Sequence, residues 1–210
     1  MAGRPARIFA GIAASDQIVM KSAQYNWQPS PVNAQRSYHR WLTDRGSLTR
    51  RLQACCPAFS VRAVHQRLDR PCRDELSAVK SRARERVLVR EVYLYCHETP
   101  VVFAHSVLNR RHLRGAWRSI SRQGMKPLGA ALFANPLVKR TPLYFKKLAP
   151  HHELYLRACR LLKALPSHLW GRRSVFIMRG KPIMVTEVFL PGILELSQWR
   201  SKRGSNSMKS

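Results

Sequence analysis

The chain has 210 residues and a hydrophobic fraction of 45%, which suits one compact domain and argues against wholesale disorder. Its formal net charge of +27 is spread along the whole sequence, in short clusters rather than in one block. No apolar run reaches the roughly 18 residues that a membrane-spanning helix needs, so no transmembrane segment is expected.

The basic charge raises the question of a nucleic-acid partner. The sequence contains no stacking motif of alternating basic and aromatic residues, no zinc-finger spacing and no RNP-like segment. We therefore expect no specific nucleic-acid partner. A soluble enzyme with a basic surface fits the charge at least as well as a nucleic-acid-binding protein, which stays an alternative. A basic surface would also attract small polyanions.

Five cysteines occur, and this odd count without a repeated CxxC pattern argues against both a disulfide framework and a zinc site. Cys96 lies in a strand-like run and Cys159 in a helix-like run, so both are interpreted as small apolar core residues. Reduced thiols and the lack of a convincing export signal predict a cytoplasmic protein.

The first part of the chain divides into a leader and the start of a domain. Residues 1–32 are interpreted as a basic, poorly ordered leader. The domain is expected over residues 33–199, followed by a disordered polar tail at residues 200–210. Within the domain, a helix is predicted over residues 33–43. Ser47 is the expected N-cap of a second short helix, and residues 60–67 form a candidate strand.

Residues 87–96 give the clearest strand signal, because they are rich in β-branched and aromatic side chains. Alternation places Arg90 on one face with Leu88, Val92, Leu94 and Cys96, and Glu91 on the other. A turn follows, and residues 101–107 return as a second strand with His105 on the face of Val101 and Phe103. An antiparallel hairpin is the simplest arrangement.

Helical patterns and a second hairpin fill the rest of the chain. Helices are predicted over residues 110–123, 126–134 and 152–165, the last with Leu154, Leu161, Leu162 and Leu165 facing inward. Residues 175–190 form a hairpin that turns at Arg179, Gly180 and Lys181. This order of elements predicts an α+β fold: one domain with a mostly antiparallel sheet and helices on one side or end.

Three polar residues on the predicted strands are candidates for a functional site. Glu187 shares its face with Ile183, Val185 and Phe189, which favours an inward carboxylate that needs a partner. Alternation leaves the direction of Arg90 open. If both point inward, they form either a structural ion pair or the two polar ends of a cavity for one small molecule.

His105 is the third candidate, although a single histidine on an apolar face is more often a hydrogen-bonded core residue than a catalytic one. The sequence contains no GxSxG, P-loop, GxGxxG or HExxH motif. Nucleophilic, nucleotide-dependent and metal-dependent chemistry therefore have no positive support.

Four blocks of the sequence resemble the chorismate pyruvate-lyase family of ubiquinone biosynthesis. They are WLTDRGSLTRRL (41–52), VREVYLYCHETPVVFAHSV (89–107), KPLGAALF (126–133) and LWGRRSVFIMRGKPIMVTEVFLP (169–191). The resemblance implies conversion of chorismate to 4-hydroxybenzoate and pyruvate without a cofactor or a metal. It also implies an antiparallel sheet whose helical flaps cover an enclosed ligand cavity, and a protein that acts as a monomer.

The resemblance also assigns roles to residues. Arg90 would bind the ring carboxylate and Glu187 the ring hydroxyl, with Leu128 and Leu48 lining the site. Many members carry Arg where this chain has His105, so His105 is a candidate for the second carboxylate. A non-enzymatic sensor of small aromatic acids, built on the same fold, is the alternative function.

Overall fold

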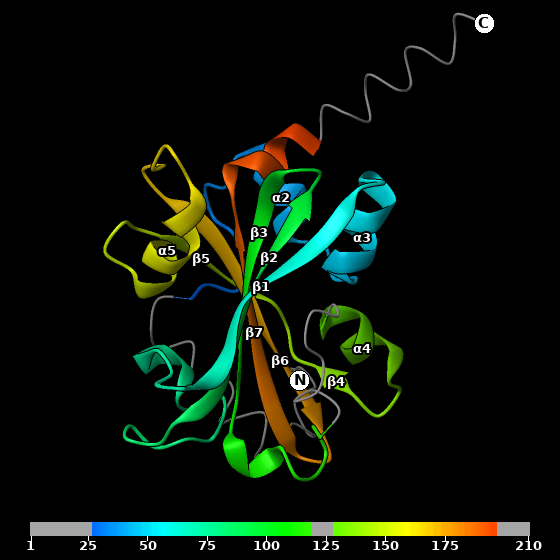
Figure 1. Ribbon diagram of the computed structural model, residues 1–210, viewed down its shortest axis with the longest axis vertical. Coiled ribbons are helices and arrows are strands. Elements are labelled where there is room, and N and C mark those ends of the chain that lie inside the picture. The colour runs from blue at the N-terminus through cyan, green and yellow to red at the C-terminus, as the bar shows by residue number, and fades with distance from the viewer. Residues whose placement is uncertain (1–26, 119–127, 197–210) are drawn as a thin grey trace, which may run out of the picture.

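The computed structural model describes residues 27–118 and 128–196, and its main element is a seven-stranded antiparallel sheet (Figure 1). The strand order is β1-β2-β3-β7-β6-β4, and β5 also pairs with β6. The strands are β1 (Phe59–Asp69), β2 (Val87–Cys96), β3 (Thr99–Leu108), β4 (Lys139–Arg140), β5 (Tyr144–Leu148), β6 (Leu169–Met178) and β7 (Lys181–Phe189). The predicted α+β fold is confirmed, including both hairpins.

Helices cover both faces of the sheet. Helices α3 (Leu48–Cys55) and α4 (Leu128–Ala134) lie on one side in Figure 1, and α5 (Glu153–Ala158) lies on the other. Helix α2 (Arg36–Leu42) precedes α3, and short 3₁₀ turns connect the other elements: η2 (Arg73–Glu75), η3 (Arg110–His112), η5 (Cys159–Leu161) and η6 (Pro191–Leu194). Because both faces are covered, nearly every residue of β2 is buried. Alternation in β2 therefore could not predict which face Arg90 occupies.

Local sequence signals explain where the elements begin and turn. The Ser47 side chain accepts a hydrogen bond from the backbone N–H of Arg50, so it is the N-cap of α3, as predicted. Helix α3 then packs Leu52, which is fully buried, against the sheet, a burial worth roughly 2 kcal/mol. At the end of β6, Arg179 and Gly180 have φ of 50° and 72°, the conformation that a two-residue hairpin requires.

Two predicted helices differ from the structure. Residues 110–118 form the 3₁₀ turn η3 and further turns, in which the Trp117 N–H bonds to the His112 carbonyl five residues earlier and its Nε1 donates to the Lys181 carbonyl. Residues 119–127 lie outside the described part. Helix α5 ends at Ala158 and continues as η5, and this change of pitch turns Leu161 and Leu165 outward, with 52% and 69% exposure.

The folded part of the chain begins before residue 33. Trp27 is buried, and its Nε1 donates a hydrogen bond of 2.7 Å to Asp74. The backbone N–H and carbonyl of Gln28 both bond with Phe145 at 2.8 Å. These two residues, which the sequence assigned to the leader, belong to the fold. Residues 1–26 and the predicted tail at 200–210 lie outside the described residues.

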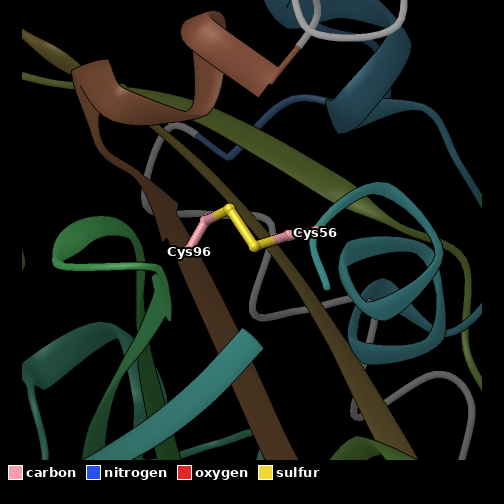
Figure 2. Close-up of a disulfide and its surroundings, with 2 residues drawn as sticks. All are labelled: Cys56 and Cys96. Carbon is pink, nitrogen blue, oxygen red and sulfur yellow. A yellow bond between two sulfur atoms is a disulfide. The ribbon is translucent and has the colours of Figure 1, made fainter. Parts of the chain in front are cut away.

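Cys56 and Cys96 form a disulfide, with 5.8 Å between their Cα atoms (Figure 2). The sequence analysis predicted free thiols, and for these two residues that prediction is wrong. An odd count requires only that one cysteine stays unpaired. The register pairs Phe59 with Cys96, which brings Cys56, just before β1, to the same edge of the sheet. The disulfide also removes the argument for the cytoplasm that rested on reduced thiols.

Within the described ranges, no helix is long and apolar enough to cross a membrane.

Candidate functional site

A cavity lies between the sheet and helices α3 and α4, with a volume of about 600 Å³ when the open space at its mouth is included. Four of the five residues predicted for the site line it: Leu48 from α3, Arg90 from β2, Leu128 from α4 and Glu187 from β7. Most of the remaining wall is apolar. A largely apolar pocket with a few converging polar groups is typical of a small-molecule site.

The sheet register fixes how the two predicted polar residues lie relative to each other. Arg90 pairs with Ser106 of β3, and Ser106 pairs with Val185 of β7. Glu187 is two residues after Val185 in β7, so its side chain lies on the same face of the sheet, in the next row of paired residues. Strand β3 separates β2 from β7, so their backbones are about 10 Å apart. A molecule with one aromatic ring and a polar group at each end fits this spacing.

Arg90 is 5% exposed, and burial lowers the pKa of its guanidinium. Its neighbours on the cavity face of β2 are Val92 and Leu94, which also line the cavity. A cation in such an apolar wall is stabilised by an anion that can accept its planar pair of N–H donors. A carboxylate that enters the cavity has the geometry to accept both of these donors.

Glu187 has a fixed partner that the sequence analysis did not identify. The Nε of Arg172 donates to Glu187 Oε2 at 2.5 Å, and the Arg172 side chain is fully buried. Arg172 Nη1 also donates to the backbone carbonyls of Trp41, Leu42 and Asp44, in the segment that leads into α3. Arg172 therefore holds one oxygen of Glu187 and joins it to the segment that carries the covering helix.

Arg140 is a second cation at the cavity that the sequence analysis missed. Its Nε donates to Ser174 Oγ and its Nη1 to the Arg45 carbonyl, both at 2.8 Å. Its guanidinium also lies over the rings of Phe133 and Phe176. Burial lowers the pKa of Arg140 to about 10, although the nearby carboxylate of Glu187 raises it. At neutral pH the cavity therefore contains two arginine cations on opposite sides of its carboxylate.

Neither Arg140 nor Arg172 gave a clear sequence signal as a site residue. Arg140 lies in a two-residue strand that sequence patterns cannot detect. Arg172 entered the sequence analysis only as one letter of the block at residues 169–191. Alternation along β6 places it on the same face as Ser174 and Phe176, two residues that line the cavity, and this pattern could have revealed it.

The two covering helices approach each other closely at Gly129. A Cβ atom at this position would lie 3.2 Å from Thr49 Oγ1, a tighter contact than most side chains tolerate. The glycine that follows Leu128 thus lets α4 pack against α3, and both helices contribute side chains to the cavity. This observation gives a packing reason for the PLG sequence at residues 127–129.

His105, the fifth predicted site residue, does not line the cavity. It lies on the opposite face of β3, fully buried, with Nδ1 3.0 Å from Glu91 and Nε2 3.2 Å from Glu75. Arg157 of α5 donates to the same oxygen of Glu91 at 2.8 Å. Because side chains alternate along β3, Ala104 and Ser106 face the cavity and His105 cannot. Its predicted role with a second carboxylate is therefore not supported by its position.

The buried partners of His105 also shift pKa values. Burial lowers the pKa of His105, but Glu75 and Glu91 outweigh this effect and raise it to about 9. Burial raises the pKa of Glu91, but hydrogen bonds from His105 and Arg157 lower it to about 2. The geometry therefore indicates a protonated histidine between two carboxylates at neutral pH.

Two groups of ligand-type side chains in the described residues lie close enough to hold a metal ion. One comprises Cys56, Cys96 and His97, but both sulfurs are in the disulfide. The other comprises Cys72, Glu75 and His105, and its atoms already have partners: the Cys72 thiol donates to Glu153, and Glu75 binds His105. Neither group lies at the cavity, whose described lining contains one carboxylate, Glu187, and no histidine or cysteine.

The sequence matches the family model described as chorismate lyase over residues 22–198. A protein of Nitrosomonas europaea named "Probable chorismate pyruvate-lyase" is 56% identical, over 81% of this chain and 96% of its own length. A Nitrosospira multiformis protein of the same name is also 56% identical, over 85% of this chain and all of its own length.

The effector domain of PhnF from Mycobacterium smegmatis is similar in fold, with a TM-score of 0.50 and 14% identity over 70% of this chain and 90% of that one.

Proposed function

The chain belongs to the chorismate lyase family, and on this basis we propose that it is a chorismate pyruvate-lyase. It would convert chorismate to 4-hydroxybenzoate and pyruvate at the first step of ubiquinone biosynthesis. The observation that carries the proposal is the placement of Arg90 and Glu187 on one cavity face, in adjacent rows of strands β2 and β7.

In this proposal the ring of the substrate lies between Arg90 and Glu187. The Arg90 guanidinium binds the ring carboxylate with two parallel hydrogen bonds. The free oxygen of Glu187 accepts a hydrogen bond from the ring hydroxyl, while Arg172 holds the other oxygen. Chorismate carries a second carboxylate on its enolpyruvyl group, and we assign that carboxylate to Arg140 rather than to His105.

The reaction removes the ring proton beside the hydroxyl and breaks the ether bond to the enolpyruvyl group. The ring becomes aromatic, and the released enolpyruvate takes up a proton to become pyruvate. No electrons are exchanged with an outside acceptor, so the chemistry requires no redox cofactor. We propose that the protein also uses no metal, and that its contribution is to hold the reactive conformer and exclude water.

Glu187 is proposed to orient the hydroxyl rather than to remove the ring proton. Its Oε2 already accepts the hydrogen bond from Arg172, which fixes the carboxylate in place and leaves its other oxygen to meet the ring hydroxyl. An orienting role predicts that Glu187→Gln retains part of the activity, because an amide oxygen can still accept the hydrogen bond. A general base at this position predicts that the glutamine variant loses activity as completely as Glu187→Ala.

The proposed function is tested by incubating the purified chain with chorismate and EDTA and following 4-hydroxybenzoate and pyruvate together. Equimolar release of both products is expected, with Glu187→Ala losing about a hundredfold or more in kcat/KM. A chain that binds chorismate but releases neither product would be a sensor, and the proposal would then be wrong.

We also propose that the protein acts as a monomer in the cytoplasm. Sizing of the purified chain tests the first part. Fractionation of cells lysed at high salt, which releases protein held on a membrane surface by charge, tests the second.

A further inference from the structure

The fold gathers positive charge at one end of the sheet, although the sequence spreads it. This basic end is formed by residues 67–86, 110–118 and 179–181, which lie at the lower end of the molecule in Figure 1. These segments carry thirteen exposed Lys and Arg side chains. The rest of the described chain, which is much longer, carries nine exposed Lys and Arg and three exposed carboxylates.

The three segments form one continuous surface. The Asn109 side chain donates to the Lys80 carbonyl at 2.9 Å, which joins the first segment to the end of β3. Trp117 Nε1 donates to the Lys181 carbonyl at 2.9 Å, which joins the second segment to the β6–β7 turn. The ion pair of Arg111 with Glu85, at 2.8 Å, connects the first two directly.

Carboxylates do little to neutralise this surface. Asp74 and Glu75 are buried, and they bind Arg173 and His105 in the interior. Asp69 and Glu85 are half-buried, and each is paired with one arginine of the basic end. No carboxylate within the three segments is exposed, so the surface has a strong positive potential.

We propose that the basic end docks the protein on an anionic lipid bilayer. Anionic headgroups are mobile in a bilayer, so clustered Lys and Arg side chains are enough to attract them. Each Lys or Arg near the bilayer surface adds to the attraction. Leu68, at 43% exposure between Arg67 and Arg70, adds an apolar contact that a bilayer can accept.

A nucleic acid fits this surface less well. Its described residues expose no aromatic side chain on which bases could stack. The 3₁₀ turns there, η2 and η3, are three residues long, so this surface offers no helix that could enter a major groove.

The basic side chains are separate from the cavity. None of the thirteen lines it, although α4, one of the helices that cover it, packs in one apolar cluster with Trp117 of the second segment. The lyase site and the docking surface can therefore be tested separately.

The test uses the full chain and vesicles of equal parts phosphatidylglycerol and phosphatidylcholine at physiological salt. The variant Arg82→Glu, Arg84→Glu, Arg86→Glu reverses three charges in the first segment, and Arg110→Glu, Arg114→Glu reverses two in the second. The control Lys147→Glu, Arg160→Glu, Lys163→Glu makes the same net change as the first variant, at exposed residues outside the basic end.

We expect the wild type to bind these vesicles and to release them at high salt, with little binding to pure phosphatidylcholine. Each basic-end variant should weaken vesicle binding by about a hundredfold or more, and the control by much less. Lyase activity should be unchanged in all three variants, which shows that they fold. If one of the two basic-end variants fails to fold, vesicle binding by the other one tests the proposal.

Three results would overturn the proposal. The first is that the wild type fails to bind the vesicles at physiological salt. The second is that the control variant loses as much binding as the basic-end variants. The third is that random duplex DNA binds more tightly than the vesicles and responds to the same variants, which would identify a nucleic acid as the partner.

Discussion

The two faces of the sheet bury charged side chains in different ways. On the cavity face, Arg90, Arg140 and Glu187 border a partly open cavity whose wall is mostly apolar. On the opposite face, His105 lies between Glu75 and Glu91, and Arg157 completes the group. The cavity residues have room for a bound anion, whereas the charges of the His105 cluster balance one another. Burial of a charge therefore does not by itself identify a functional residue. A buried charge that borders a cavity is the better candidate for ligand binding.

The largest expected effect is loss of stability when the His105 cluster is broken. His105→Gln removes the cation between two buried carboxylates, which should lower the free energy of unfolding by about 3–5 kcal/mol. His105→Arg keeps a cation there and should lose much less. Urea denaturation measures both variants, and a large loss of kcat/KM in folded His105→Arg would contradict the structural role.

Arg90→Ala should lower catalytic activity and leave stability nearly unchanged. It removes the cation that we propose binds the ring carboxylate, so kcat/KM for chorismate should fall about a hundredfold or more. The melting temperature should change little compared with that of His105→Gln, because truncation also removes a poorly solvated charge. Steady-state kinetics and thermal unfolding of the same preparation check both parts. Activity within a fewfold of wild type would remove Arg90 from the site.

The pKa shifts in the His105 cluster predict a window of maximum stability. The raised pKa of His105 gives stability that is complete below about pH 6.5 and is lost as the pH rises through about 9. The lowered pKa of Glu91 gives stability that is present above about pH 4.5 and is lost as the pH falls toward about 2.

Denaturation of wild type and His105→Gln across this range isolates the contribution of the histidine. The difference between them should shrink by an amount on the order of 3 kcal/mol between about pH 6.5 and 9. A constant difference would mean that His105 is not protonated in the folded protein.

A smaller effect is expected for the disulfide, which joins the end of α3 to the end of β2 (Figure 2). Replacing both Cys56 and Cys96 by serine frees a loop with a sequence separation of 40 residues. This should lower the free energy of unfolding by about 2–4 kcal/mol. Thiol titration of the unfolded wild type, which should find three free thiols and five after reduction, tests whether the bond forms.

The sequence predicted the fold class because it depends on local signals, and four of the residues that it proposed for a site line one cavity. The β-branched runs gave β2, β3 and the last hairpin, and the apolar neighbours of Glu187 indicated its inward direction. The resemblance to the family supplied Leu48, Leu128 and the pairing of Arg90 with Glu187 as two ends of one cavity.

The missed features depend on register and on contacts between distant segments. Arg172 binds backbone carbonyls about 130 residues earlier in the chain, and Arg140 lies in a strand of two residues. The placement of His105 at the site was wrong because a resemblance in position does not give the face of a strand. The disulfide was missed because the β1–β2 register, not the number of cysteines, brings Cys56 to Cys96.

The most direct test of the contrast between the two faces is the affinity for 4-hydroxybenzoate, measured by calorimetry on Arg90→Ala and His105→Arg in parallel with wild type. The structure predicts that Arg90→Ala raises Kd about a hundredfold or more, and that His105→Arg leaves it within about threefold. An unchanged Kd in Arg90→Ala, or a comparable loss in folded His105→Arg, would contradict the assignment of binding to the cavity face.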